Sequence, residues 1–390
     1  MDFALTDEQR LLVETAERIG SRFGLDYWRE LDRDHRFPAE IWAALCDAGL
    51  VGAAVPAVHG GSGLGMLDLT LIIEAVTAGG AGGTLAQLFM LNPVFGCHAI
   101  VGFGNERMKR EYLPRLLSGE FHLSFALTEP DAGNNSLNIK TRAVRSEGGW
   151  RINGQKVWIT IARESDLMLV VARTTAASEV QKRTDGISMF LIDSARAGIR
   201  MTEIEKAATL TLPFYSVFFD DVQVSEDDLV GTLDGAWPQL AELLNGERIV
   251  TAAGLLGTGR LAIRLAVDYA KQRKIFGTRS IAEYQAVQFP LARCHAELEC
   301  ARLMNRKAAW LLDNGQPFGS EANAAKLIAA DAAIAATDRA LQTLGGMGFA
   351  RESYVERLWR DARVCAVAPI PQEMILGYIG THDLGMPRSY

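Results

Sequence analysis

Two charged residues, Glu247 and Arg248, stand side by side in the apolar run LLNGERIVTAAGLLG, residues 243–257. At helical spacing the carboxylate of Glu247 would project along a stripe of apolar side chains rather than into water. Burial of a carboxylate is costly and raises its pKa toward neutrality, which suits a residue that accepts a proton during a reaction. A structural ion pair, within the helix or with another helix, would account for the same two residues.

Two further segments have the composition of a ligand site. FALTEPDAGNNS, residues 125–136, is typical of a strand entering a turn rich in Pro, Gly and Asn, whose exposed backbone N–H groups can hold a phosphate or the polar edge of a ring. In KVWIT, residues 156–160, Trp158 and Thr160 are two apart and would face the same side of a strand. Taken singly, the first segment could be an ordinary turn and Trp158 an ordinary core residue.

The elements that would position these residues change in kind along the chain. Apolar periodicity and capping residues predict an N-terminal helical domain in residues 1–120. Short alternating or β-branched runs predict a β domain in residues 121–235, with Asn153 and Gly154 forming a hairpin turn. Helical periodicity returns in residues 236–390, and the fold class is therefore α+β. A four-helix bundle is expected there, with helices at 237–273, 281–313, 320–344 and 352–379.

Composition limits the partners and the compartment. The chain has 390 residues, 48% hydrophobic and 22% charged, an ordinary globular balance. Its net charge of -7 and the lack of a basic run disfavour nucleic acid and anionic membranes. Five cysteines without a CxxC pair, and an N-terminus unlike a signal peptide, predict a cytoplasmic protein. No apolar run approaches the roughly twenty residues of a membrane span, and no histidine has metal-ligand spacing, so no metal is expected.

Motifs spread along nearly the whole chain resemble those of one family. In order, they are LTDEQ, ALTEPDAG, NGQKVWIT, YAKQRKIFG, IAEYQAVQFPLA, LQTLGGMGF and RLWRDARV. Together they resemble the acyl-CoA dehydrogenase family of flavoenzymes. The resemblance implies an N-terminal helical domain, a middle β-barrel and a C-terminal four-helix bundle, in agreement with the layout above. It also implies bound FAD and assembly as a homotetramer, a dimer of dimers.

The resemblance assigns flavin contacts to particular residues. Leu127 and Thr128 would meet the polar edge of the isoalloxazine ring. Gly133 and its neighbour Asn134 would meet the pyrophosphate, although the family usually has Ser-Asp where this chain has Asn134 and Asn135. Trp158 and Thr160 would flank the ring near N5. A neighbouring subunit would hold the adenosine and pyrophosphate portion through Arg273, Phe276, Gln285, Gln342, Gly345 and Gly346. Arginine suits a diphosphate, and glycine lets backbone approach closely.

Dehydrogenation of an acyl thioester needs a base for the α-proton while the β-hydrogen leaves as hydride to flavin N5. Many family members carry that glutamate in a YEGT loop soon after RDAR. Here those four places hold Ala368, Pro369, Ile370 and Pro371. A branch similar to isovaleryl-CoA and long-chain dehydrogenases instead carries a glutamate directly before an arginine on the bundle's first helix. Glu247 matches that base, with Arg248 as its positioning or ion-pair partner, and Glu373 is a second choice.

Pro369 departs from the family in a further way. The family activates the thioester carbonyl with a flavin ribityl hydroxyl and the backbone N–H of this loop residue, and proline has no N–H. Loss of one such donor costs on the order of 3 kcal/mol of transition-state stabilisation. Either the loop shifts so that Ile370 donates, or another group substitutes, or the chemistry is altered.

The sequence thus predicts an FAD-dependent acyl-CoA dehydrogenase that passes electrons to an electron-transfer flavoprotein. Two alternatives stay open: a non-catalytic subunit of a heteromeric complex, or an FAD-dependent oxidase or monooxygenase on the same fold. The acyl group is not specified. Small residues such as Ala252, Ala253, Gly254 and Gly257 would leave room for a bulky acyl chain, or would only let helices pack closely.

Overall fold

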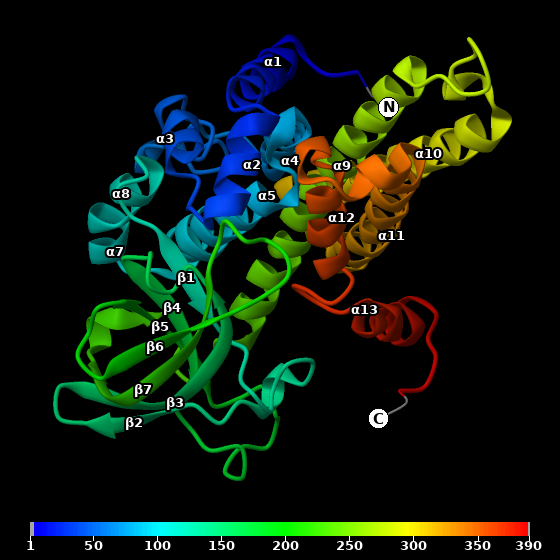
Figure 1. Cartoon of the computed structure of the whole chain (residues 1–390). Coiled ribbons are helices and arrows are strands. Elements are labelled where there is room, and N and C mark those ends of the chain that lie inside the picture. Colours follow the sequence, from blue (N-terminus) through cyan, green and yellow to red (C-terminus); the bar gives the residue numbers. More distant parts are fainter. Residues whose placement is uncertain (1–3, 389–390) are drawn as a thin grey trace.

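The computed structural model describes residues 4–388, which form a helical region, a sheet and a second helical region in chain order (Figure 1). The first region contains α1 Asp7–Arg22, α2 Leu25–Asp34, α3 Ala39–Asp47, α4 Met66–Val76, α5 Gly83–Phe89, α6 Ala99–Phe103, α7 Glu106–Glu111 and α8 Leu113–Leu117. Helix α1 starts with a capping box, in which the Thr6 hydroxyl accepts from the Gln9 N–H and the Gln9 side chain accepts from the Thr6 N–H. Turns of π-helix, Thr77–Ala81 and Met90–His98, flank α5.

The middle region is one sheet of eight strands within the described residues. The strands are β1 Leu123–Ala126, β2 Arg142–Ser146, β3 Gly149–Thr160, β4 Leu167–Arg173, β5 Ile187–Asp193, β6 Ile199–Ile204, β7 Phe214–Val224 and β8 Leu229–Val230. The pairing order is β6-β7-β3-β2-β4-β5-β8, with β1 parallel to β4. No pairing joins β6 to β8 among these strands, so the expected barrel is open at this edge.

The predicted hairpin turn at Asn153 and Gly154 is wrong. Both residues lie within β3, where the pairing with β7 shifts register between Ile152 and Gly154. Gly154 has a φ of +152°, and a Cβ there would lie 2.5 Å from the hydroxyl of Thr141. The glycine therefore serves a bulge and a close backbone approach rather than a turn. The hairpin turn lies earlier, where Ser146 pairs with Gly149.

The C-terminal region confirms three of the four predicted long helices. They are α9 Trp237–Gln272, α10 Gln285–Asp313 and α11 Gly319–Leu344. The fourth, expected at 352–379, is interrupted and forms α12 Val355–Val364 and α13 Gln372–Tyr378. Pro369 and Pro371 lie in the intervening loop 365–371, and neither can donate a helical hydrogen bond. The interruption matters because this loop contains residues 368–371, the four places at which the resemblance led us to look for a base.

Helix α12 joins the three regions. The buried carboxylate of Asp361 accepts from the backbone N–H of Thr209 at 2.7 Å and from the hydroxyl of Thr84 at 2.9 Å. One turn earlier, the buried guanidinium of Arg357 donates to the carbonyls of Gly80 at 2.8 Å and Ala81 at 3.1 Å. The motif RLWRDARV is therefore a structural joint that fixes α12 against the sheet region and the first helices.

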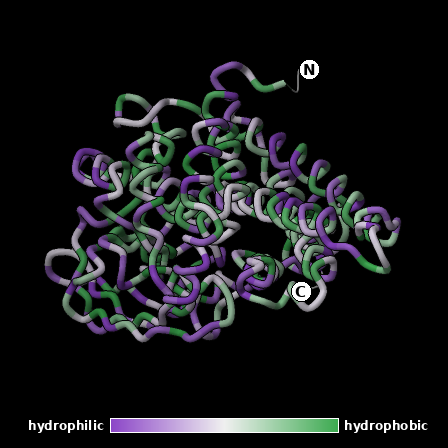
Figure 2. The backbone as a smooth tube through the Cα atoms, turned by 45° about the horizontal axis from the view of Figure 1, so that its top comes forward, coloured by the Kyte–Doolittle hydropathy of each residue, from purple (hydrophilic) through white to green (hydrophobic). Residues whose placement is uncertain are grey.

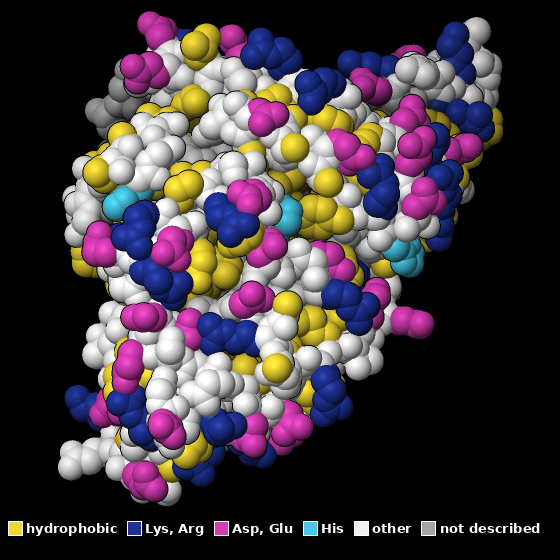
Figure 3. Space-filling view, turned by 90° about the vertical axis from the view of Figure 1, so that its left-hand side faces the viewer, with side chains coloured by type: hydrophobic (Ala, Val, Ile, Leu, Met, Phe, Trp, Pro, Cys, Tyr) yellow, Lys and Arg dark blue, Asp and Glu magenta, His cyan; other side chains and the backbone are white. Residues whose placement is uncertain are grey.

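The surface and the hydropathy pattern are those of helices with one buried face. In Figure 2, purple and green turns alternate along the helices of the C-terminal region. On the face in Figure 3, acidic and basic side chains are interspersed, without an extended basic patch. Two stretches, Gly83–Phe103 and Trp237–Gln272, are long and apolar enough to cross a membrane by length and composition alone, contrary to our expectation. Their most apolar windows are 72% and 78% buried in the protein, as in core helices, so this indication is weak.

Candidate active site

Glu247 lies on α9, the helix that connects two cores. Leu243 and Val250 belong to the core shared with the N-terminal helices, whereas Leu255 packs with α11 and α10. Only 6% of Glu247 is exposed, and in residues 4–388 no hydrogen bond or ion pair within 4 Å involves its carboxyl group. Burial raises the pKa of Glu247 to about 8, although the charges of Arg248 and Lys326 oppose this shift. A buried, unpaired carboxyl group of this kind is suited to accept a proton near neutral pH.

Arg248 does not form the direct ion pair with Glu247 that we considered. Adjacent residues on a helix point about 100° apart, so their side chains do not face each other. The Nη1 atom of Arg248 instead donates to the side-chain oxygen of Asn245, one turn earlier. Arg248 therefore acts on Glu247 through the electrostatic field and not through a shared hydrogen bond.

The loop 365–371 is held by a buried lysine on α11. The Nζ atom of Lys326 donates to the carbonyl of Cys365 at 2.6 Å and to the carbonyl of Ile370 at 2.7 Å. Lys326 is fully buried and also interacts electrostatically with Glu247. One cation therefore both holds this loop and acts on the carboxyl group of Glu247, a relationship that the sequence did not reveal.

Ile370 carries the one unused backbone donor of this loop. Across 365–372, all of which the structure describes, Pro369 and Pro371 have no N–H. The other residues donate to backbone carbonyls three to six residues earlier, except Ile370, whose N–H has no acceptor among the described residues. We considered three outcomes of the missing N–H at Pro369. Of these, donation by the N–H of Ile370 is available in the observed conformation of the loop. Glu373 is exposed in the first turn of α13 and lacks the apolar surroundings of Glu247.

The first group of expected flavin contacts lies where β1 meets β3. The backbone N–H of Val157 donates to the carbonyl of Thr128 at 2.9 Å, and Lys156 donates to the carbonyl of Leu127 at 2.8 Å. Trp158 is 53% exposed and has a φ of +62°, so it is not a core residue. A register shift between Lys156 and Ile159 breaks strand alternation, and Thr160 is buried while Trp158 is exposed. Regular strand alternation therefore does not hold between these two residues.

The loop after β1 has the features of a phosphate site. A Cβ added at Gly133 would have no neighbour within 4 Å, so open space borders its backbone. The backbone N–H groups of Gly133, Asn134 and Asn135 donate to no acceptor among the described residues. Consecutive free N–H groups beside open space fit an anionic group such as a pyrophosphate.

A buried ion pair that the sequence pattern did not indicate holds this loop. Lys156 Nζ lies 2.8 Å from Glu129 Oε1, and both side chains are buried. Burial lowers the pKa of Lys156 to about 8, while Glu129 opposes that shift. Burial alone would raise the pKa of Glu129, but Lys156 and the backbone N–H groups of Lys140 and Thr141 lower it overall. The lysine lies two residues before Trp158 and the glutamate directly after Thr128, 27 residues apart, so no single segment of sequence shows the pair.

The second group of expected flavin contacts lies at one end of the bundle, where α9 ends, α10 begins and α11 ends. Its members are Arg273, Phe276, Gln285, Gln342, Gly345 and Gly346. Phe276 is 96% exposed, and a Cβ at Gly345 or Gly346 would have no neighbour within 4 Å. Figure 1 places the turn after α9 at the opposite side of the molecule from β3. Within one chain, the residues of each group therefore lie close together, but the two groups lie far from each other.

The small residues of α9 do not leave a void. A Cβ on Gly254 would lie 2.3 Å from the Cβ of Ala86, and a Cβ on Gly257 would lie 1.8 Å from the hydroxyl of Thr77. The glycines let α9 approach α5 and the π-helical turn after α4 closely. At Gly254 and Gly257 the small residues therefore serve close helix packing. The other interpretation, that they leave room for a bulky acyl chain, is wrong at these positions.

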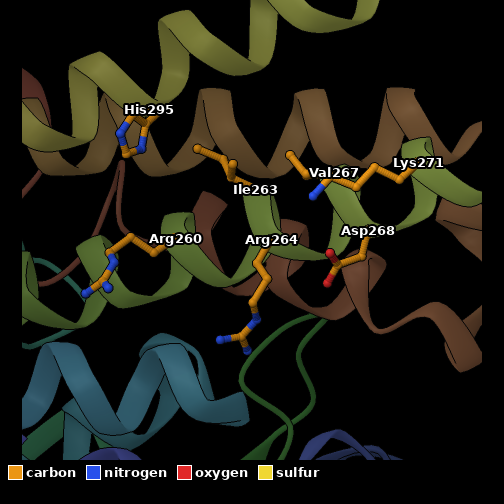
Figure 4. Close-up of a pocket in the computed structure, with 7 residues that line it drawn as sticks. All are labelled: Arg260, Ile263, Arg264, Val267, Asp268, Lys271 and His295. Atoms are coloured by element: carbon orange, nitrogen blue, oxygen red, sulfur yellow. The ribbon is translucent and has the colours of Figure 1, made fainter. Parts of the chain in front are cut away.

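Two cavities border α9 at different positions along the helix. A cavity of about 80 Å³ adjoins the turn that precedes Glu247, and it is lined by Val94, His98, Gly102, Phe103, Glu242, Leu243, Gly246 and Leu312. A shallower pocket of about 340 Å³ lies between α9 and α10 (Figure 4), about 20 Å or more further along α9. In Figure 4, Arg260 and Arg264 turn away toward the N-terminal helices. There they bind the carboxylate of Glu74 at 2.6 Å and the carbonyl of Ala78 at 2.8 Å, so the two arginines serve the joint between domains.

Comparison with known proteins agrees with this geometry. Three family models match the chain in order: the acyl-CoA dehydrogenase N-terminal domain at residues 6–120, the middle domain at 124–222 and the C-terminal domain at 235–379. The chain belongs to the acyl-CoA dehydrogenase family. It is an oxidoreductase and a flavoprotein of that family, as the motifs indicated.

Individual relatives support the same assignment over the full length. Acyl-CoA dehydrogenase FadE12 of Mycobacterium tuberculosis is 37% identical over 390 residues, which cover 100% of this chain and 99% of the relative. The solved structure of butyryl-CoA dehydrogenase from Megasphaera elsdenii has a TM-score of 0.93 at 30% identity, with 98% of this chain and 100% of that one covered. The FAD complex of PigA has a TM-score of 0.92 at 26% identity, covering 99% and 100%.

FAD is the cofactor of this acyl-CoA dehydrogenase. The residues present fit it, since the loop at Gly133 offers free N–H groups and the exposed Trp158 offers an aromatic surface. When bound, FAD supplies the hydride acceptor.

Proposed function

We propose that this acyl-CoA dehydrogenase removes the α-proton and β-hydride from an acyl-CoA thioester, with Glu247 as the base. The observation that carries the proposal is the buried carboxyl group of Glu247, which has no ion-pair partner within the described residues and a pKa raised to about 8. The loop that holds the base in many relatives has no carboxylate at residues 368–371. A raised pKa matches the base to an acidified α-proton, because proton transfer is most efficient between groups of similar pKa.

The residues of this chain divide the work as follows. Glu247 accepts the proton from the α-carbon, and its apolar surroundings keep water from competing for that proton. The unused N–H of Ile370 donates to the thioester oxygen, which gains negative charge as the α-proton leaves. Trp158 and the loop at Gly133 would hold the flavin, which would supply the acceptor for the β-hydrogen and its electron pair.

The assembly and the electron acceptor belong to the same proposal. Because the two groups of flavin contacts lie apart in one chain, a complete site needs a second copy, in keeping with a homotetramer. Reduced flavin must be reoxidised, and we propose an electron-transfer flavoprotein as the acceptor. We also propose a cytoplasmic location, from the reduced state that five free cysteines suit.

Anaerobic bleaching of the flavin tests the proposal. The purified protein should be yellow and should bleach with one or more members of an acyl-CoA panel that spans short, branched, long and cyclic chains. Glu247→Gln should stay yellow and lose bleaching, while Glu373→Gln should keep it. Bleaching in Glu247→Gln and its loss in Glu373→Gln would reverse the assignment of the base.

Two other outcomes correspond to the alternatives. A colourless chain that becomes yellow only with a second, different subunit would make this chain a non-catalytic component. Oxygen consumption coupled to substrate oxidation would make it an oxidase or monooxygenase, which the lost N–H at Pro369 keeps open.

A further inference from the structure

Lys326 ties both ends of one loop to the bundle. Its ammonium donates to the carbonyl of Cys365, the first residue of the loop 365–371, and to the carbonyl of Ile370 near the end of that loop. The distances of 2.6 Å and 2.7 Å are those of charge-assisted hydrogen bonds. Removing this one side chain would release the loop at two points.

The same ammonium acts on the carboxyl group of Glu247. Two cations lower the pKa of that group against the effect of burial, Arg248 on the same helix and Lys326 on α11. The other titratable groups of this region act on those two cations. They are Cys365 and Asp331, which interact with Lys326, and Tyr378, which interacts with Arg248.

A neutral residue could hold the loop but could not act on the base. Burial lowers the pKa of Lys326, so the fold spends free energy to keep an ammonium here. The two carbonyls favour its charged form and occupy two of its three N–H groups. Cys365 does not offset the charge, because burial raises the pKa of its thiol to about 11 and leaves it neutral near pH 7.

We propose that Lys326 is a positioning residue of the dehydrogenation: its ammonium fixes the loop that carries the Ile370 N–H and is one of the charges that act on Glu247. This proposal rests on the role of Glu247 as the base. A single cation would then set the position of the N–H that donates to the thioester carbonyl, and also the protonation state of the base.

Two substitutions in the FAD-loaded protein separate the charge from the tether. Lys326→Met removes both, whereas Lys326→Gln removes the charge and keeps an N–H donor. Loss of the cation disfavours the carboxylate of Glu247. The acid limb of the pH profile, where the bleaching rate falls as pH decreases, should therefore move to higher pH in both variants, by on the order of one pH unit. Hydrogen exchange in residues 365–372 should be about tenfold faster in Lys326→Met than in Lys326→Gln, as expected for one lost hydrogen bond.

The wild type and Glu247→Gln supply the reference. If the wild type bleaches without an acid limb, or if Glu247→Gln bleaches normally, the base assignment fails whatever Lys326 does. With the limb established, an unmoved limb in both variants overturns the electrostatic role, and unchanged loop exchange overturns the tether. If Lys326→Met does not fold, Lys326→Gln decides the charge. Lys326→Arg then decides the tether, because it keeps the charge with a different donor geometry and should speed loop exchange without moving the limb.

Discussion

Lys156 and Glu129 form a buried ion pair, 2.8 Å from Nζ to Oε1, across the junction between β3 and the loop after β1. The same lysine donates to the carbonyl of Leu127, and the same carboxylate accepts from the backbone of Lys140 and Thr141. The pair therefore fixes the backbone that carries Leu127 and Thr128 against the strand that carries Trp158. Flavin affinity should depend on this pair although neither charge faces open space.

Lys156→Met should destabilise the protein and release flavin. It leaves the carboxylate of Glu129 buried without its cation, which costs about 3–5 kcal/mol of unfolding free energy. The double variant Lys156→Met with Glu129→Gln should recover part of that loss, because no unpaired charge remains. Thermal unfolding and the ratio of flavin to protein absorbance measure both effects. A single variant with unchanged stability and flavin content would show that the pair does not support the site.

Ile370→Pro should slow the reaction far more than Ile370→Ala. Proline removes the unused N–H, whereas alanine keeps it and removes only the side chain. Loss of one donor to a developing oxyanion costs about 3 kcal/mol, or more than a hundredfold in rate. Single-turnover bleaching compares the two variants at equal flavin content. Equal rates would assign carbonyl activation to another group.

The stability of the protein should fall as pH rises from about 5 to about 9, in part because of Glu247. Its folded-state pKa, about 8, lies above the value of an unfolded glutamate, so the folded state binds the proton more tightly. The stabilisation is complete below the unfolded pKa and is lost as pH rises through about 8. Glu247→Gln should remove this term, worth a few kcal/mol, and should unfold at a higher temperature than the wild type at pH 9. The two proteins should differ least at pH 5, and a constant difference in unfolding temperature across this range would contradict the burial of an ionising carboxyl group.

Gly254→Ala should destabilise the protein by about 1–3 kcal/mol, because its Cβ would overlap Ala86 on α5. Gly102→Ala is the matched control, since a Cβ there meets nothing within 4 Å and alanine favours a helix. Chemical denaturation of the two variants compares their unfolding free energies. Equal stabilities would mean that α9 can move away from α5 without cost, and would reopen this stretch as space for substrate.

The sequence predicted the parts of the fold that follow from local pattern. Helices α9, α10 and α11 have long apolar periods, and β4 and β5 are short, mostly apolar runs. Strands β2 and β6 were not predicted, because RAVRS and IRMTEI are short and rich in charges that face solvent. The NG dipeptide in β3 misled the prediction, since the same glycine also suits a bulge.

The residues of the candidate site divide in the same way, into those with a local signal in the sequence and those without one. Glu247 was found because a charge in an apolar helix stands out in one segment of sequence. Lys326 and Lys156 were missed because each takes its meaning from a partner far along the chain, Ile370 and Glu129 respectively. Only the packing of α11 on the loop 365–371, and of β3 on β1, brings those partners together.

The most direct test of the central claim is the exchange of the α-proton of a substrate acyl-CoA with D2O, followed anaerobically on the FAD-loaded protein. This reaction reports proton abstraction without requiring the hydride to leave. Glu247→Gln should slow the exchange by about 10² to 10⁴, the contribution of a general base, while retaining its flavin. Exchange at the wild-type rate in that variant would show that another group takes the proton.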